Sequence, residues 1–170
     1  MDEERKLGLI PQVRIPGALG VNIYAILITT RRLLFIRTSK GYGFILGGAV
    51  GAAIGSYYGD KGTRPFTDPA ILRDIDINTL KEEKGNKDIL IDNITKVKLK
   101  KGLAANKLSI YGLKKNKKKL LLEGYLVPPS GYTKGYKEEG LDSKEISLRY
   151  IQETESIFQT VLLDRIERNY

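Results

Sequence analysis

The sequence predicts a mainly β, α+β fold in which a strongly bent antiparallel barrel or sandwich of seven strands is closed by a long C-terminal α-helix. Short runs rich in Ile, Leu, Val, Tyr and Phe recur between turn residues, which is typical of strands. Helical spacing of apolar residues is clearest near the C-terminus, over about 143–169. The 170 residues are expected to form a single domain, 1–170, with a glycine-rich insertion at about 41–66.

The N-terminal strands are predicted first. The segment Leu9–Ile15 alternates loosely and contains Pro11, which favours a short edge strand. Asn22–Ile28 and Arg32–Arg37 are expected to form a hairpin, with Thr29–Arg31 as its turn. Their nearly continuous apolar content indicates that both faces of this hairpin are at least partly covered.

The middle of the chain carries one helix signal and one loop signal. Asp68 followed by Pro69 is typical of an N-cap and first helical residue, so a short helix or turn is expected from about Ala70. The charged segment Lys81–Lys87 contains a turn dipeptide and is predicted to be an exposed, flexible loop.

Alternation with a period of two is plain from Thr95 to Lys100 and predicts a strand with its lysines on the outer face. Leu108 and Ile110 continue the core face in the next strand, with Lys107, Ser109 and Tyr111 expected to point outward. The segment Gly112–Lys117 is expected to be the tip of the hairpin that follows.

The C-terminal third is expected to contain an irregular segment and then the long helix. Gly124–Gly140 is rich in Gly and Pro and is predicted to lack regular structure, with its tyrosines packed down. Asp142 and Glu145 form a capping-box pattern at the start of the helix. The expected apolar stripe is Ile146, Tyr150, Ile157, Phe158, Val161, Leu162 and Ile166, and the expected solvated face is Arg149, Glu153, Glu155, Asp164 and Arg168.

Several of these segments resemble the pleckstrin-homology-like domains, especially the bacterial and archaeal ones and their GRAM-like relatives. The similar stretches are YAILITTRRLLFI from Tyr24, DNITKVKLKKG from Asp92, KLSIY from Lys107 and KKLLLE from Lys118. The resemblance implies a bent barrel whose end is plugged by the C-terminal helix. In lipid-binding members of the family, basic residues in an early loop commonly hold the anion. Here the hairpin turn offers only Arg31 and Arg32.

A glycine zipper occupies the segment from Gly43 to Gly59, where Gly recurs every fourth residue. In a helix these glycines would share one face, and each costs about 1 kcal/mol relative to Ala, so close packing must compensate. The partner could be another element of the protein, a second copy of the chain or a bilayer. The apolar run is too short to cross a membrane. The candidate membrane or self-association residues are Gly43, Phe44, Ile45, Leu46, Gly47, Val50, Gly51, Ile54, Gly55 and Gly59.

The composition argues against an enzyme. The chain has no Cys and no His, which removes thiolate chemistry, most zinc sites and the usual neutral-pH general base. Asp74 and Asp76 form a D-x-D pattern that a strand or turn would explain. We therefore expect no catalytic residue, metal or cofactor. The N-terminus lacks a secretory pattern, so a cytoplasmic location is expected, with peripheral association at the inner membrane face.

The formal net charge of +9 is concentrated in one stretch, where ten lysines and no acid lie between Lys96 and Lys119. Such a patch points to an anionic partner, although solvated strand faces would also explain it. The candidate anion-binding residues are Arg31, Arg32, Lys96, Lys98, Lys100, Lys101, Lys114, Lys115, Lys117, Lys118 and Lys119.

Three function classes follow from these patterns. The favoured one is a non-catalytic binding module that associates with an anionic lipid surface or a protein partner, with homo-oligomers forming through the zipper. The alternative is a nucleic-acid-binding protein that uses the lysine patch. Against this alternative, the patch contains lysine where base and phosphate recognition favours arginine. An enzyme is the third class.

Overall fold

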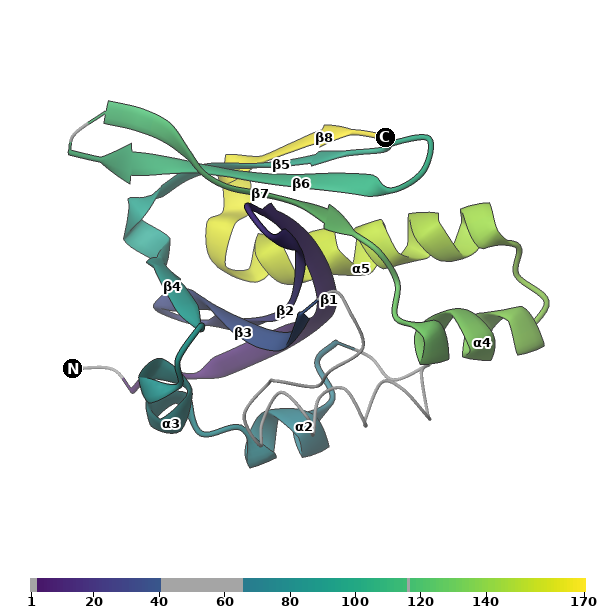
Figure 1. Cartoon of the computed structure of the whole chain (residues 1–170), viewed down its shortest axis with the longest axis horizontal. Helices are drawn as coiled ribbons and strands as arrows, with labels where there is room; N and C mark the ends of the chain where they lie inside the picture. The colour runs from purple at the N-terminus through teal and green to yellow at the C-terminus, as the bar shows by residue number, and fades with distance from the viewer. Residues whose placement is uncertain (1–2, 41–65, 116) are drawn as a thin grey trace.

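The computed structural model describes residues 3–40, 66–115 and 117–170, so the predicted glycine zipper lies outside the described residues (Figure 1). One sheet contains eight strands in the order β4-β3-β2-β1-β7-β6-β5-β8. The strands are β1 (Lys6–Gly17), β2 (Gly20–Thr29), β3 (Arg32–Lys40), β4 (Lys87–Leu90), β5 (Ile94–Lys100), β6 (Asn106–Lys114), β7 (Lys117–Leu126) and β8 (Ile166–Asn169). The helices are α2 (Pro69–Asp74), α3 (Ile77–Glu82), α4 (Ser130–Glu138) and α5 (Ser143–Leu162), with 3-10 turns η1 (Ile91–Asn93) and η2 (Leu163–Arg165).

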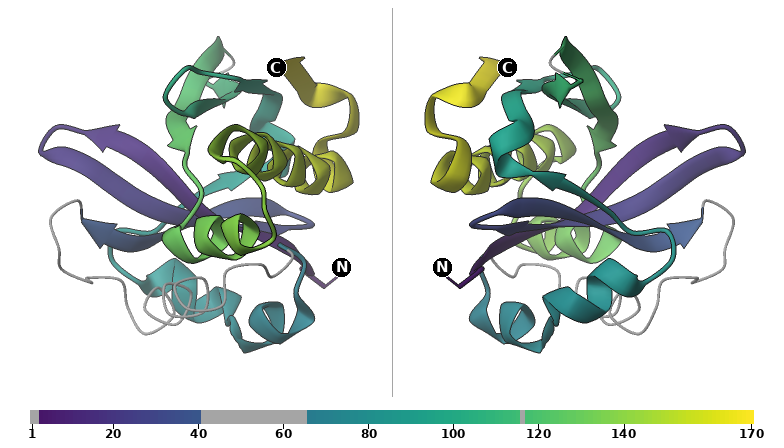
Figure 2. Two further views of the ribbon diagram at one scale, coloured as in Figure 1. Left: turned by 90° about the vertical axis from the view of Figure 1, so that its right-hand side faces the viewer. Right: turned by 90° about the vertical axis from the view of Figure 1, so that its left-hand side faces the viewer.

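The sheet bends so that its two halves face each other, and α5 lies across the opening between them (Figures 1 and 2). The main core fills this bend and contains the buried hydrophobic residues of α5. A second, smaller core lies on the other face of β2 and β3, where Leu27 and Leu34 meet Ile71 and Leu80 of α2 and α3. The prediction that this hairpin is covered on both faces is therefore confirmed, as is the mainly β, α+β class.

The predicted position of the first strand was wrong, because β1 is central in the sheet and pairs with both β2 and β7. Pro11 is tolerated there because the β1–β2 register shifts between Ile10 and Val13, forming a bulge. The hydroxyl of Tyr150 on α5 accepts from the Gln12 backbone N–H and donates to the Gln12 carbonyl, both at 2.9 Å. The backbone groups of the bulge are thus satisfied by a side chain 138 residues away.

Two further boundaries differ from the prediction. The C-terminal helix ends at Leu162 rather than Asn169, since Leu163 takes a positive φ of 41° and the chain turns back. The guanidinium of Arg165 donates to the carbonyls of Ile91 and Ile94 at 3.1 and 2.9 Å, which holds this return. The chain then forms β8, an eighth strand that runs parallel to β5, so the expectation of seven strands, all antiparallel, was wrong.

The segment predicted to be irregular, Gly124–Gly140, contains the end of β7 and the nine-residue helix α4. Its glycines are poor helix formers, but burial of Tyr132 and Tyr136 outweighs that cost. The ring of Tyr132 lies 5.1 Å from that of Tyr150 and 6.1 Å from that of Phe66. The expected packing of Tyr132 and Tyr136 is therefore confirmed. Tyr125 is instead exposed on β7.

The local helix signals were correct at both N-termini. Asp68 accepts from the Ala70 N–H at 2.8 Å and caps α2. Asp142 and Glu145 form the capping box of α5. The predicted loop at Lys81–Lys87 is shorter than expected, because α3 continues to Glu82 and β4 begins at Lys87.

The predicted faces of α5 were correct for most residues. Ile146, Tyr150, Ile157, Phe158 and Leu162 are buried as expected, and Val161 is half-buried. Two residues depart from the expected solvated face. Glu155 is buried and bonds to Arg168 and Tyr170, and Glu153 is half-buried, which raises its pKa.

Candidate functional site

The candidate cationic residues fall into separate groups in the folded protein. On β5, the predicted alternation is confirmed, with Val97 and Leu99 buried and Lys96 and Lys100 exposed. The side chains of Lys96 and Lys98 both bind the carboxylate of Glu167 on β8, with an Nζ–Oε1 distance of 2.6 Å for Lys98.

These contacts shift the pKa values of both Glu167 and Lys98. Hydrogen bonds from Lys96 and Lys98, together with their charges, lower the pKa of Glu167 to about 2. The hydrogen bond to Glu167 and its charge raise the pKa of Lys98. Two of the predicted anion-binding lysines are therefore paired with a carboxylate at neutral pH, and sequence reasoning had placed no acid near them.

The β6 strand shows a similar pairing. Lys107 lies 2.8 Å from a carboxylate oxygen of Glu123 on β7, and this hydrogen bond raises the pKa of Lys107. Ser109, predicted to point into solvent, is buried and lies 3.5 Å from the other oxygen of Glu123. The outer face of the β5–β7 strands is thus a network of lysines and two glutamates rather than an unbroken cationic surface.

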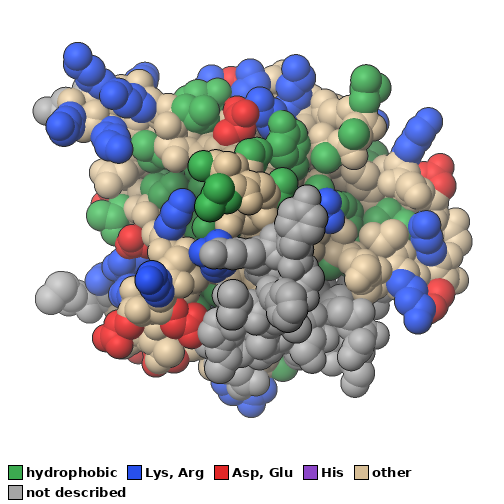
Figure 3. Space-filling view, viewed as in Figure 1, with side chains coloured by type: hydrophobic (Ala, Val, Ile, Leu, Met, Phe, Trp, Pro, Cys, Tyr) green, Lys and Arg blue, Asp and Glu red, His purple; other side chains and the backbone are tan. Residues whose placement is uncertain are grey.

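The hairpin tip between β6 and β7 is different in character, and we call it the lysine tip. It comprises Lys114, Lys115, Lys117, Lys118 and Lys119. All five are exposed, and among the residues that the structure describes no carboxylate forms an ion pair with them. Figure 3 shows this group in blue at the upper left of the molecule.

Apolar side chains accompany the lysine tip. Leu113 is 44% exposed and lies opposite Lys118, and Leu120 is 49% exposed and lies opposite Tyr111. Large apolar side chains at this level of exposure beside clustered lysines give the tip an amphipathic surface.

Lys100 and Lys101 lie at the far end of the same sheet half, where β5 leads into β6 (Figure 1). Lys101 donates its backbone N–H to the Asn169 carbonyl at 3.1 Å, which ties this loop to β8. These two residues are separated from the lysine tip by the length of β6.

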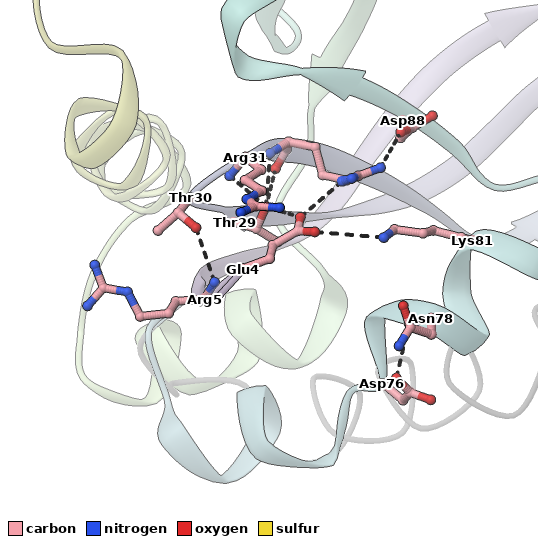
Figure 4. A network of polar contacts seen from close by, with 10 residues as sticks. Glu4, Arg5, Thr29, Thr30, Arg31, Asp76, Asn78, Lys81 and Asp88 are labelled. Carbon is pink, nitrogen blue, oxygen red and sulfur yellow. Dashed lines mark hydrogen bonds and ion pairs between the residues drawn. The ribbon is translucent and has the colours of Figure 1, made fainter. Parts of the chain in front are cut away.

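The basic residues of the early hairpin turn have structural contacts (Figure 4). The Arg32 guanidinium lies 3.0 Å from Glu4 and 2.9 Å from Asp88, and its side chain is only 19% exposed. Glu4 also accepts from Thr29 at 2.7 Å and lies 3.7 Å from Lys81. This network joins the N-terminus, β3, β4 and α3, so Arg32 is engaged in holding the fold.

Arg31, the other basic residue of this turn, has a backbone contact: its carbonyl accepts a hydrogen bond from the Ile91 N–H at 2.9 Å. This bond fixes the start of η1 against the β2–β3 turn.

Beside the lysine tip lies a groove of about 900 Å³, bounded by β3 and β4 on one side and by the β6–β7 hairpin on the other. Its apolar lining includes Ile15, Phe35, Ile89, Leu90, Leu121 and Leu122. Lys87 from β4 and Lys114 from the lysine tip contribute ammonium groups. The sequence pattern does not reveal this groove, because its walls come from five strands, β1, β3, β4, β6 and β7, that meet only through folding.

Gly112 helps to position the hairpin next to this groove. A Cβ atom at this position would lie 2.3 Å from the Asn93 carbonyl oxygen and 2.4 Å from a methyl carbon of Leu121. Only glycine allows η1 to approach the β6–β7 hairpin this closely, two residues before the end of β6.

Asp76, one of the two acids of the D-x-D pattern, has a structural role. Asp76 caps α3, accepting from the Asn78 N–H at 3.0 Å and from the Thr79 hydroxyl at 2.7 Å, which explains this half of the D-x-D pattern. No group of acidic residues within residues 3–40, 66–115 and 117–170 is arranged to hold a metal ion. Within the same ranges, no helix has the length and apolar character to cross a bilayer.

No family model, curated protein or solved structure matches this chain.

Proposed function

We propose that this protein is a non-catalytic binding module that associates peripherally with anionic membrane surfaces through the lysine tip. The observation that carries the proposal is the gathering of five exposed lysines, unpaired with any carboxylate of the described residues, around two half-exposed leucines on one hairpin. Cationic and apolar groups on one projecting element suit an interface between anionic headgroups and acyl chains.

The expected energies are sufficient for reversible association. Each lysine near an anionic leaflet contributes about 1 kcal/mol, so three to five engaged lysines contribute roughly 3–5 kcal/mol. Contact of Leu113 and Leu120 with the headgroup and acyl boundary supplies the second signal that stable anchoring requires. Lys96 and Lys98 share the carboxylate of Glu167, which offsets one of their two charges, so they contribute less and the lysine tip is the main contact.

The architecture supports a pleckstrin-homology-like assignment as part of this proposal. The four N-terminal strands, β1 to β4, pair in sequence order, and β5 to β7 pair likewise. Helix α5 follows β7, with the short helix α4 between them. The departures are β8 and the position of the cationic residues, which lie on the β6–β7 tip rather than in the early loops.

The test is co-sedimentation with vesicles of phosphatidylglycerol and phosphatidylcholine, and with vesicles of phosphatidylcholine alone. The triple variant Lys117→Ser, Lys118→Ser, Lys119→Ser removes three charges from the tip. A matched control, Lys134→Ser, Lys137→Ser, Lys144→Ser, removes three exposed charges from α4 and the start of α5.

We expect the tip variant to bind the anionic vesicles about 100-fold more weakly and the control to change only a few-fold. Binding of the natural protein should also weaken as salt rises, because salt screens exposed charges. Equal losses in the two variants would show that net charge, not the tip, drives association. Unchanged binding by the tip variant would refute the proposal. Preference for an oligonucleotide over the vesicles at equal salt would favour the nucleic-acid alternative.

A further inference from the structure

The groove beside the lysine tip has apolar walls whose side chains are only partly buried. Ile15, Ile89 and Leu122 pack against the main core on one side and are half-buried, so the remainder of each side chain faces the groove. A groove of about 900 Å³ falls within the range of about 300–1,000 Å³ that small-molecule sites occupy. In Figure 3, hydrophobic side chains in green lie below and to the right of the blue tip.

The charged residues of the groove leave two cations available for a ligand. Arg32 is held by Asp88, and Glu123 is held by Lys107. Lys87 and Lys114 then remain, and neither forms an ion pair with a carboxylate among the described residues. Lys87 lies 5.9 Å from the centre of the Tyr24 ring, a contact that orients its ammonium group without neutralising it. The groove therefore combines an aliphatic wall with a local excess of positive charge.

We propose that the groove binds one phosphate-bearing membrane lipid, with an aliphatic chain against Ile15, Ile89 and Leu122 and the phosphate held by Lys87 and Lys114. This inference rests on the proposed function, because the lysine tip that borders the groove would bring it to the headgroup region. Charge complementarity selects an anionic headgroup, and the aliphatic lining selects a chain rather than a free phosphate ion.

The first test uses a series of n-alkyl phosphates, kept below their critical micelle concentrations and titrated into the full chain by calorimetry. Affinity should rise about fourfold for each added methylene, the factor that burial of one methylene supplies, until the groove is filled. Inorganic phosphate and the uncharged alkanol of equal length should bind far more weakly. Affinity that is independent of chain length would overturn the proposal.

The second test uses variants with matched controls. Ile89→Trp places an indole in the groove and should weaken binding of the longest alkyl phosphate at least tenfold, whereas Leu103→Trp, on the fully exposed β5–β6 loop, should leave it unchanged. Lys87→Gln keeps the apolar wall and changes an exposed residue, so it remains informative if Ile89→Trp fails to fold. It should weaken alkyl phosphate binding about tenfold while leaving the dependence on chain length intact. Unchanged affinity in Lys87→Gln would refute the assigned phosphate position.

The two proposals can fail separately. The triple tip variant retains Lys87, Lys114 and the apolar wall, so it should lose vesicle association and still bind monomeric alkyl phosphate. Loss of alkyl phosphate binding in that variant would place the ligand on the tip rather than in the groove. Vesicle binding by the natural protein without any alkyl phosphate binding would overturn the groove proposal alone.

Discussion

Replacing Tyr150 with Phe tests how the central strand tolerates its proline. The hydroxyl of Tyr150 serves both the N–H and the carbonyl of Gln12, which the bulge beside Pro11 removes from the β1–β2 ladder. The Tyr150 side chain is fully buried, so the aromatic ring should keep its packing when the hydroxyl is removed.

The expected cost follows from the two groups left unpaired. Each buried donor or acceptor without a partner costs about 1–3 kcal/mol, and the half-buried position of Gln12 favours the lower end of that range. We therefore expect Tyr150→Phe to lower the free energy of unfolding by about 2–3 kcal/mol. For a chain of 170 residues this corresponds to a fall in Tm of roughly 5–10 °C.

Urea denaturation followed by circular dichroism measures the change, and Tyr132→Phe is the matched control. Tyr132 is as deeply buried as Tyr150 and lies in the same ring cluster, but its hydroxyl makes no hydrogen bond of good geometry with the described residues, and Glu153 and Tyr136 lie close enough only for a weak polar contact. Its removal should change the free energy of unfolding by less than about 0.5 kcal/mol, or stabilise the protein. Equal effects of the two substitutions would show that the hydroxyl does not support the bulge.

Two further substitutions test the polar contacts. Burial acts to raise the pKa of Glu4, but the Thr29 hydrogen bond and the Arg32 and Lys81 charges outweigh it and lower the pKa, so Glu4 stabilises the fold above its unfolded pKa. Glu4→Gln should cost about 2 kcal/mol at pH 7, and denaturation curves should show this deficit shrinking as pH falls through the folded pKa; a deficit that is constant with pH would contradict this assignment. Glu167→Gln leaves the charges of Lys96 and Lys98 uncompensated. We expect this variant to bind phosphatidylglycerol vesicles about fivefold more tightly, as measured by co-sedimentation. Unchanged sedimentation would mean that this strand face stays away from the membrane.

The sequence by itself determined the features whose causes lie within a few residues of one another. The caps at Asp68 and Asp142 were predictable because a carboxylate reaches N–H groups two or three residues ahead. The β2–β3 hairpin and the alternation of Val97 and Leu99 with lysines on β5 were predictable because period and turn composition are local. The cationic tip could also be placed, since Lys114–Lys119 lie next to one another in the sequence.

Tertiary structure decided the features that depend on distant partners. Pro11 is accommodated in a central strand by a bulge whose backbone groups bond to Tyr150, and α4 forms despite its glycines because Tyr132 and Tyr136 gain buried aromatic contacts. The largest difference between the sequence prediction and the structure is the charge of the outer face of β5. Lys96 and Lys98 appear in a stretch without acids, yet Glu167, about 70 residues later in the chain, binds both ammonium groups and offsets one of their two charges once β8 pairs with β5. Coulomb energy depends on separation in space, which the order of residues does not fix until the strands pair.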